Sequence, residues 1–385
     1  MINIEKLKTL DLKSRDKLRA QSILLGKPLI GPQSINIVIV QACDRKCAFC
    51  WYFSPMVKNP PKRKILEYEV LERTLIDCQE MGVDEINLEG GEVVLYPHAE
   101  KTFHKVKELG MRLRAYSHLD FESKHLKYLA LADMLTVNLS AMTEDLYQQV
   151  HGKTTGTLHN LLRHLDLLMG LNRKYGKPKI TLSFVLYKDN YKQLKAFLDL
   201  AQERGVEAIV IRFFKATQDM GALMLDEDMV LELREVVKVV KDYPYTFRHN
   251  LQGLWDTISD GMLLDKLVAI DHAPTHNDRL FFWDSTKGKK TRCHVGRYYA
   301  HIDEHGVVAG PCDNVGICIA GNIYERSFKD IWFNSQNLNE TLVEASEGIK
   351  TCNPKWKECR YCSWLSVNKF LDDKVNYARS SRKNT

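Results

Sequence analysis

Three cysteines in the segment CDRKCAFC are spaced so that one small inorganic centre could bind all of them. Cys43, Cys47 and Cys50 follow the apolar run INIVIV at residues 35–40 in a CxxxCxxC pattern. Structural zinc sites are closed by four protein ligands and commonly use paired CxxC spacings. A trio without a nearby fourth ligand suits a [4Fe–4S] cluster with one iron left open, and zinc is the alternative.

A second segment, LEGGEVVLYP, carries Gly90, Gly91 and Glu92 directly after another apolar run. Glycines let the backbone approach a ligand closely, and a carboxylate can pair with an ammonium group. This segment is therefore a candidate contact for a small ligand.

Both segments belong to a series of apolar runs that alternate with helix-like segments. We predict helices over 66–81 and 97–109, and strands over six ranges: 35–40, 84–90, 111–116, 134–140, 180–187 and 207–214. Six β–α units in series predict an α/β fold with a parallel sheet covered by helices. Such sheets place their chemistry at the carboxyl ends of the strands, which is where both segments fall.

The cysteine motif after strand one, Phe49 before its last cysteine, and GGE after strand two together resemble the radical S-adenosylmethionine (radical SAM) enzymes. The family often has Pro after the Glu, where this chain has Val93. The resemblance implies a partial (β/α)6 barrel whose [4Fe–4S] cluster chelates S-adenosylmethionine at its open iron. It further implies reductive cleavage to a 5′-deoxyadenosyl radical that abstracts a substrate hydrogen, with electrons from a flavodoxin- or ferredoxin-type donor.

The same resemblance suggests which residues contact S-adenosylmethionine. Asn138 aligns by eye with a Ser that often touches the cofactor in relatives, and Ser140 aligns with a frequent Asp. Ser183, on strand five, could face the cofactor or only tolerate a polar neighbour. The cofactor-binding candidates are Phe49, Gly90, Gly91, Glu92, Asn138 and Ser183.

Six further cysteines gather between residues 293 and 362, around HIDEHGVVAGPC, a predicted hairpin with Gly306 at its turn. This region, with GNIYERSFKDIWFN, resembles the SPASM and Twitch modules that bind auxiliary [4Fe–4S] clusters. The resemblance implies as ligands Cys293, Cys312, Cys359 and Cys362, with Cys318 and Cys352 spare, alternative ligands, or part of a second cluster. Two fully ligated clusters need eight thiolates, so we expect one auxiliary cluster; zinc in this domain is the alternative.

The remaining features define the organisation of the chain. We predict five segments: an N-terminal extension (1–34), the radical SAM core (35–214), a helical connecting segment (215–290), the auxiliary iron–sulfur domain (291–365) and a basic tail (366–385). The basic residues of the N-terminal segment, among them Arg15 and Arg19, are expected to be solvated. Cys78, on a helix face with Leu71 and Leu75, is expected in the core.

The composition excludes several functional classes. A hydrophobic fraction of 44% in 385 residues and a formal charge of +6 are ordinary for a globular protein. The sequence has no uninterrupted run of 18 apolar residues, so it predicts no membrane span, and no secretory signal is recognisable. We therefore expect a cytoplasmic protein. No nucleic-acid-binding signature is present.

The substrate is the least determined feature. Thirty-four residues precede strand one, too few for the leader-peptide-binding winged helix of some peptide-modifying relatives. We therefore expect a small-molecule substrate, sugar- or aminocyclitol-like, that is oxidised or rearranged. The alternatives are a ribosomal peptide or protein side chain, and, in a different class, a non-catalytic iron–sulfur or zinc protein.

Overall fold

The computed structural model describes most of the chain, in the following ranges: 7, 9–58, 62–152, 157–214, 218–259, 292–310, 318–349, 368, 370–376 and 379. These residues form two compact units. Unit 1 takes described residues from Met1–Ala42, Arg63–Arg114 and Asp284–Thr385, and unit 2 takes them from Cys43–Lys62 and Ala115–Trp283.

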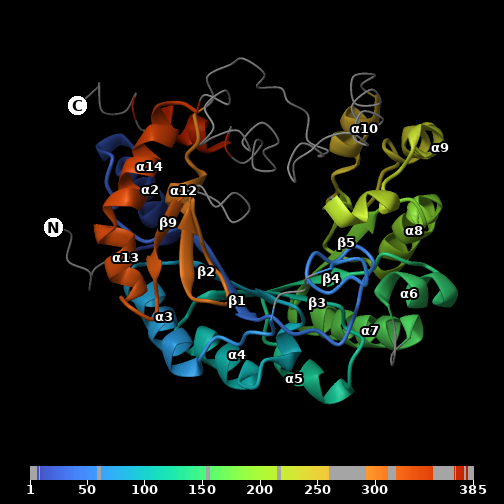
Figure 1. The fold of residues 1–385 in the computed structure, drawn as a ribbon, viewed down its shortest axis with the longest axis horizontal. Helices are drawn as coiled ribbons and strands as arrows, with labels where there is room; N and C mark the ends of the chain where they lie inside the picture. The colour runs from blue at the N-terminus through green and yellow to red at the C-terminus, as the bar shows by residue number, and fades with distance from the viewer. Residues whose placement is uncertain are drawn as a thin grey trace. The chain divides into compact units, whose positions relative to one another are not determined.

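Unit 2 contains parallel strands and the helices that follow them (Figure 1). The last residues of β3 (Arg112–Ser117) are followed by β4 (Met134–Asn138), β5 (Lys179–Leu186) and β6 (Ala208–Phe213). Parallel pairing sets Asn138 opposite Ser183. The helical elements are η2 (Ser123–His125), α5 (Leu126–Leu129), α6 (Glu144–His151), α7 (Leu158–Tyr175), η3 (Tyr191–Gln193), α8 (Leu194–Arg204), η4 (Gln218–Leu223), α9 (Glu227–Val240) and α10 (Leu251–Ser259).

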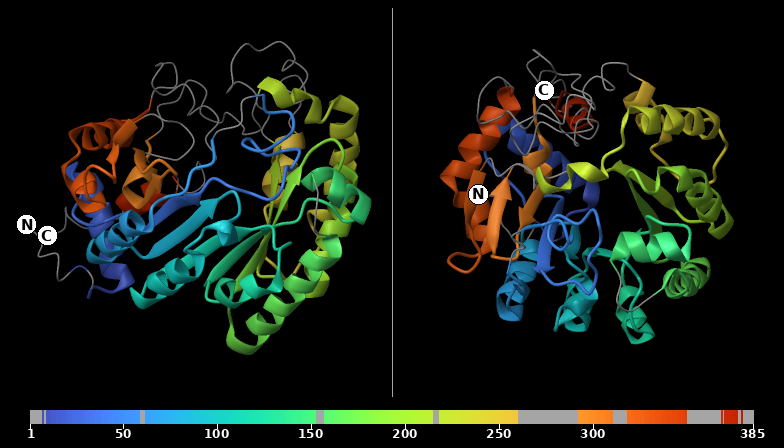
Figure 2. Two further views of the ribbon diagram at one scale, coloured as in Figure 1. Left: turned by 60° about the horizontal axis from the view of Figure 1, so that its bottom comes forward. Right: turned by 45° about the vertical axis from the view of Figure 1, so that its right-hand side comes forward.

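Sequence pattern explains why β5 and its neighbouring helices form. The run KITLSFVL is buried at six of its eight positions, as expected for a strand covered on both faces. On α7, Leu161, Leu165 and Leu168 form a buried stripe, and Thr157 caps its first turn by accepting the Asn160 amide. Figure 2 shows these helices alongside the strands that they cover.

Unit 1 combines parallel and antiparallel strands. Its order is β2 (Glu85–Gly90), β1 (Ser34–Val40), β7 (Tyr299–Ile302), β8 (Val307–Gly310) and β9 (Cys318–Asn322), with the first residues of β3 beyond β2. Both neighbours of β1 run parallel to it, whereas β7, β8 and β9 are antiparallel. The helical elements are α2 (Leu12–Leu25), α3 (Tyr68–Glu80), η1 (Val93–Leu95), α4 (Ala99–Glu108), α12 (Val295–Tyr298), α13 (Phe328–Asn334) and α14 (Gln336–Glu347).

The predicted α/β fold is confirmed. Each of the six predicted strands is present, to within about two residues at its ends. The parallel strands do not close into a barrel among the described residues, in agreement with the predicted partial barrel. Gly306 forms the hairpin turn with φ +77°, and Cys78 is fully buried as predicted. The division into five segments stays a prediction.

The N-terminal helix α2 corrects our expectation for its basic residues. Arg19 is buried at 1% exposure and lies 2.7 Å from the Asp84 carboxylate, which also accepts from Arg15 at 2.8 Å. The Arg19 guanidinium also donates to the carbonyl oxygens of Gly31 and Gly82. Arg19 is therefore a structural residue rather than a solvated one. No helix among the described residues is long and apolar enough to cross a membrane.

Candidate metal and cofactor site

The three cysteines predicted to bind a metal centre lie on one loop of unit 2. Cys43, Cys47 and Cys50 are half-buried and form no disulfide. Burial raises the pKa of the Cys47 thiol well above its usual range, and the thiolate charges of Cys43 and Cys50 raise it further. Burial also raises the pKa of Cys50. Bound iron ions would supply positive charge that stabilises the thiolate forms of these closely spaced cysteines. The three residues therefore fit an iron–sulfur cluster.

A buried ion pair fixes this cysteine loop to the end of β3. Arg45 Nη2 lies 2.7 Å from Asp120 Oδ2, and both side chains are at most 1% exposed. Asp120 Oδ2 also accepts from the Tyr147 hydroxyl at 3.1 Å. Its Oδ1 accepts from the Thr157 amide at 3.1 Å and from Asn160 Nδ2 at 3.0 Å. Both carboxylate oxygens are thus satisfied, as a buried charge requires.

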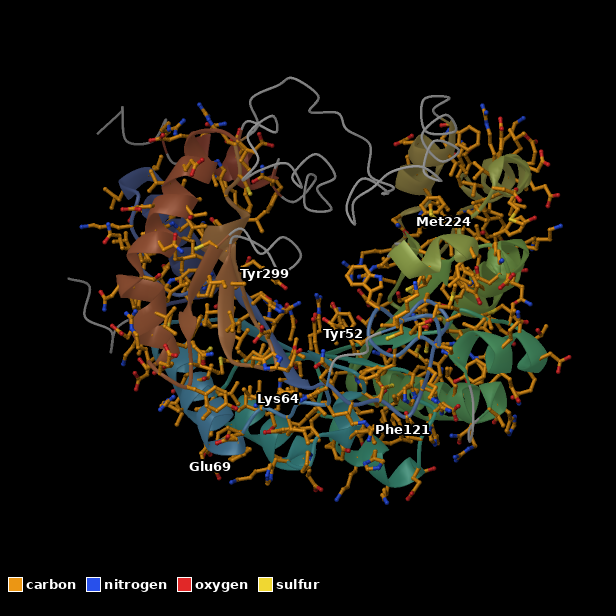
Figure 3. The ribbon with its side chains drawn as sticks, viewed as in Figure 1. Tyr52, Lys64, Glu69, Phe121, Met224 and Tyr299 are labelled. Atoms are coloured by element: carbon orange, nitrogen blue, oxygen red, sulfur yellow. The ribbon has the colours of Figure 1, made fainter. Side chains whose placement is uncertain are left out.

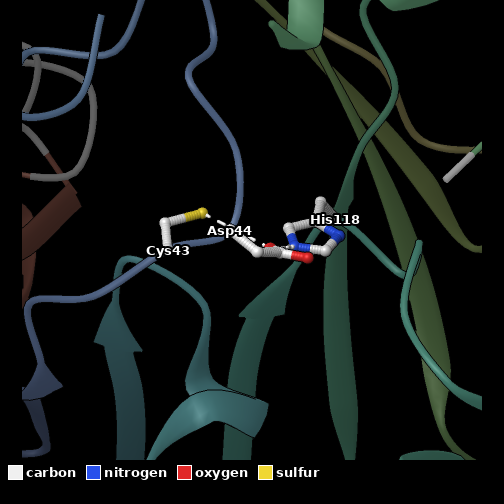
Figure 4. Close-up of side chains that lie close together, drawn as sticks. All are labelled: Cys43, Asp44 and His118. Carbon is white, nitrogen blue, oxygen red and sulfur yellow. Dashed lines mark hydrogen bonds and ion pairs between the residues drawn. The ribbon is translucent and has the colours of Figure 1, made fainter. Parts of the chain in front are cut away.

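A second anchor joins Asp44 to His118 (Figure 4). The Asp120 amide donates to His118 Nδ1 at 3.0 Å, which leaves the ring hydrogen on Nε2 to be donated to Asp44 Oδ1 at 2.8 Å. Ligand atoms of Cys43, Asp44 and His118 lie within 4.8 Å of one another and could hold a metal ion. Both ring nitrogens of His118 are already engaged, which favours an anchoring role for His118 over zinc ligation.

The turn between these anchors is strained. Leu119, buried between His118 and Asp120, has φ +54°, a left-handed conformation that costs a non-glycine residue about 1–2 kcal/mol. Its amide donates to the Ser117 hydroxyl at 3.0 Å, and its carbonyl lies 2.8 Å from His164 Nδ1. Such strain persists where surrounding contacts fix the backbone, and here both flanking side chains contact the cysteine loop.

The end of α6 holds the same loop from another side. The amides of Lys46 and Ala48 donate to the carbonyls of His151 and Val150 at 3.3 and 2.8 Å. Cys47 Sγ lies 3.2 Å from His151 Nδ1. Burial lowers the pKa of His151 to about 3, so its ring is neutral near pH 7.

Phe49, a cofactor-binding candidate, lies between two buried rings. Its ring centroid is 6.0 Å from that of His151 and 6.0 Å from that of Tyr187, both in edge-on arrangements. The Tyr187 hydroxyl is buried and has no hydrogen-bond partner among the described residues. Burial raises the pKa of Tyr187, so it remains a hydrogen-bond donor. Tyr52, on the same loop, is labelled in Figure 3 and is 45% exposed.

Asn138 and Ser183 are brought together at the ends of β4 and β5. They are paired residues of neighbouring parallel strands, so their side chains share one face of the sheet. Ser140 is fully buried, donates to Asn138 Oδ1 at 3.2 Å and accepts the Val185 amide at 2.9 Å. Ser140 therefore orients Asn138 rather than facing a ligand.

In unit 1 the GGE segment lies against the end of β1. A Cβ on Gly90 (φ +151°) would lie 2.1 Å from the Val40 carbonyl oxygen, so only glycine permits this approach. The Gly91 amide donates to Val40 at 2.9 Å, and the Glu92 amide donates to Ala42, the residue before Cys43, at 2.9 Å. The Glu92 carboxylate is buried and accepts the amide of Val94 at 3.4 Å. Its pairing with an ammonium group stays a prediction.

Two of the six C-terminal cysteines belong to the described residues. Cys293 is half-buried, and its amide donates to the Ala345 carbonyl at 2.8 Å. Cys318 begins β9, is buried, and pairs with Gly310. The other predicted or alternative ligands, Cys312, Cys352, Cys359 and Cys362, lie outside the described residues, and the ligand set stays a prediction.

The sequence reasoning missed the side chains that hold the cysteine loop. Arg45 and His118 carry no recognisable motif, and Asp120 is separated from Arg45 by 75 residues. One signal was available: SHLD follows a predicted strand, so its polar residues belong at the edge where chemistry was expected.

Comparison with known proteins begins with two family profiles. The Radical SAM superfamily profile matches residues 37–201. The SPASM profile, described as an iron–sulfur cluster-binding domain, matches residues 293–363.

The curated relatives are distant. A GTP 3′,8-cyclase of Campylobacter fetus subsp. fetus is 22% identical over 202 residues, which is 52% of this chain and 61% of the relative. A probable GTP 3′,8-cyclase of Saccharolobus islandicus is 24% identical over 189 residues, covering 48% of this chain and 56% of the relative. The chain thus spans about three-fifths of the length of the curated relatives that it matches.

The solved structures that resemble this fold cover more of the chain. Streptococcus suis SuiB bound to S-adenosylmethionine has a TM-score of 0.58 at 17% identity, covering 86% of this chain and 72% of SuiB. SuiB bound to its precursor peptide SuiA also gives 0.58, at 16% identity, covering 91% and 75%. The enzyme anSMEcpe with bound AdoMet and a Kp18Cys peptide gives 0.53, at 15% identity, covering 88% of each chain.

The two profiles match the two regions that carry the cysteine motifs, and the similar structures share the fold. Proteins of the radical SAM superfamily bind a [4Fe–4S] cluster and S-adenosylmethionine, and SPASM domains bind auxiliary iron–sulfur clusters, so these are the cofactors that the two matched regions imply. The chain carries a radical SAM domain and a SPASM-type domain.

Proposed function

We propose that Cys43, Cys47 and Cys50 hold the S-adenosylmethionine-binding cluster and that the enzyme modifies a peptide or protein side chain. The observation that carries the ligand assignment is the half-buried loop that holds all three free cysteines. Burial, followed by the neighbouring thiolate charges, raises the pKa of Cys47. When bound, the cluster and S-adenosylmethionine supply a 5′-deoxyadenosyl radical that removes a hydrogen atom from the substrate.

The surrounding residues position this chemistry. Arg45 and Asp120 fix the loop, since their buried pair leaves little freedom between the first two cysteines. Asn138 and Ser183 offer adjacent hydrogen-bonding groups at strand ends and are proposed to contact S-adenosylmethionine. We assign the same role to Phe49 and to the segment Gly90–Glu92.

The substrate class is inferred from the extent of the structural similarity. The structures with bound peptide, SuiB with SuiA and anSMEcpe with Kp18Cys, cover 91% and 88% of this chain. The matches to GTP 3′,8-cyclases cover only about half of it. This favours a peptide over the sugar-like molecule expected from the sequence, with GTP as the second candidate.

For the auxiliary site we propose one [4Fe–4S] cluster bound by Cys293, Cys312, Cys359 and Cys362. The test is an iron count on a variant with Ala in place of the three cysteines of the first loop. About four irons per chain should remain, because one [4Fe–4S] centre is left. Finding none, or about eight, would refute a single auxiliary cluster.

Activity is tested with protein reconstituted under anaerobic conditions. Dithionite, or reduced flavodoxin as a model donor, should support 5′-deoxyadenosine formation by the wild type and not by Cys47→Ala. Lack of product from the fully loaded wild type would contradict radical SAM activity.

The substrate test compares two classes directly. Peptides encoded by small open reading frames beside the gene should stimulate 5′-deoxyadenosine formation and change in mass, and GTP should do neither. Stimulation by GTP, or by none of the peptides, would overturn the peptide assignment.

A further inference from the structure

The contact between His151 and Cys47 is fixed from both sides. His151 is the last residue of α6 and is 1% exposed. Hydrogen bonds from the amides of Lys46 and Ala48, which flank Cys47, end on the carbonyls of His151 and Val150. These bonds hold the backbone of His151 beside that of Cys47. The distance of 3.2 Å between Nδ1 and Sγ is within hydrogen-bond range for sulfur.

Neighbouring rings also fix the orientation of the imidazole. Its centroid lies 4.5 Å from that of Tyr147 and 6.0 Å from that of Phe49. Its Nε2 is buried with no hydrogen-bond partner among the described residues. A ring rotated by a half turn would put the carbon Cδ2 in place of Nδ1 and lose the hydrogen bond, so the sulfur contact selects Nδ1 as the atom facing Cys47.

The chemistry of the sulfur decides where the ring hydrogen lies. A metal-bound thiolate only accepts hydrogen bonds, so a neutral imidazole in contact with it carries its hydrogen on the near nitrogen. Here that nitrogen is Nδ1, and the buried Nε2 keeps its lone pair. Outer-shell hydrogen bonds of this kind tune a metal centre through its ligands.

We propose that His151 donates its Nδ1–H to the Cys47 sulfur and thereby raises the reduction potential of the S-adenosylmethionine-binding cluster. This inference rests on the ligand role of Cys47 given under the proposed function. Reduction adds negative charge that is shared with the cysteine sulfurs, and a hydrogen bond to a sulfur stabilises that charge. His151 touches neither substrate nor iron in this account, so it is a positioning residue that acts through Cys47.

Two variants separate the hydrogen bond from the packing. His151→Asn keeps an N–H group near the position of Nδ1, and His151→Leu has a similar branched shape without a donor. At the wild-type midpoint potential we expect the ratio of reduced to oxidised cluster to fall about tenfold in His151→Leu, which is 59 mV for one electron. His151→Asn should stay within about threefold of wild type, because its donor replaces the lost hydrogen bond.

The readout is a redox titration followed by electron paramagnetic resonance. The signal that changes on adding S-adenosylmethionine identifies this cluster among the others. If that signal survives Cys47→Ala, the ligand assignment fails. If it requires Cys47 but His151→Leu titrates at the wild-type potential with full iron content, the inference about His151 fails.

A measurement on the wild type covers the case in which His151→Leu does not bind iron. Labelling histidine with ¹⁵N should add a weak nitrogen coupling to the S-adenosylmethionine-sensitive signal. The coupling should disappear in His151→Asn, which carries no labelled residue at this position. Absence of the coupling in the wild type, or its survival in His151→Asn, would overturn the proposal.

Discussion

Replacing Gly152 with Ala should displace the cysteine loop. Gly152 caps the C-terminus of α6 with φ +54°, and a Cβ there would lie 2.3 Å from the carbonyl oxygen of Lys46. Ordinary contact begins at 3.4 Å. The Lys46 peptide, which lies between Cys43 and Cys47, must therefore move by about 1 Å, because a close-packed backbone cannot absorb the overlap.

The magnitude follows from two contributions. The left-handed conformation costs Ala about 1–2 kcal/mol. Moving the peptide weakens the hydrogen bonds from Lys46 to His151 (3.3 Å) and from Ala48 to Val150 (2.8 Å), and each is worth about 0.5–1.5 kcal/mol net. Together we expect the free energy of unfolding to fall by about 2–5 kcal/mol.

Gly205 provides a matched control. It caps the C-terminus of α8 in the same unit with φ +64°, and a Cβ there would meet no atom within 4 Å. Gly205→Ala therefore carries the conformational cost alone, about 1–2 kcal/mol. The difference between the two variants, about 1–3 kcal/mol, measures the displacement of the cysteine loop.

The assay combines urea unfolding of the metal-free proteins with iron counting after reconstitution. Gly152→Ala should unfold at a lower urea concentration than Gly205→Ala and retain less iron. Equal midpoints together with equal iron contents would refute the idea that Gly152 supports the cysteine loop.

Three further predictions concern buried polar groups. Arg19→Met removes one partner of the buried ion pair with Asp84. The free energy of unfolding, measured in urea, should fall by about 3–5 kcal/mol. A loss below about 1 kcal/mol would mean that the pair contributes no more than a surface salt bridge. Asp120→Asn removes the negative charge that lies 2.7 Å from Arg45 and should lower iron retention during gel filtration. Wild-type retention would contradict the anchor. Burial lowers the pKa of His164, so the unfolded chain takes up more protons and stability should fall as the pH drops below about 6.5. His164→Phe should show a shallower fall, and an unchanged slope would exclude this contribution.

Much of the fold could be predicted from the sequence because its signals are local. Apolar runs such as INIVIV form buried strands, and β1 at Ser34–Val40 matches the prediction closely. The cysteine motif is also local, since Cys43, Cys47 and Cys50 lie on one loop. Such features depend on neighbouring residues, which a sequence displays directly.

The residues that support the site could not be predicted in the same way. Asp120 meets Arg45 only because the end of β3 lies beside the cysteine loop. In the sequence, each of these two charged residues alone would be interpreted as an ordinary surface residue. The expectation that Arg19 is solvated was wrong for the same reason, because its partner Asp84 comes after the first strand in the sequence. The unusual backbone of Leu119 gives no sequence signal, since leucine rarely adopts a positive φ.

The pairing of β1 with β7 has a consequence for biosynthesis. Ser34 pairs with Tyr299, so the apolar strand that leads into the cysteine motif lacks one neighbour until the C-terminal hairpin has been translated. An open, apolar strand edge invites pairing between nascent chains, and contacts this distant in sequence form slowly. Deleting the C-terminal region would therefore expose that edge and favour aggregation. Point substitutions of its cysteines are thus the cleaner means of separating the role of the auxiliary site from assembly of the chain.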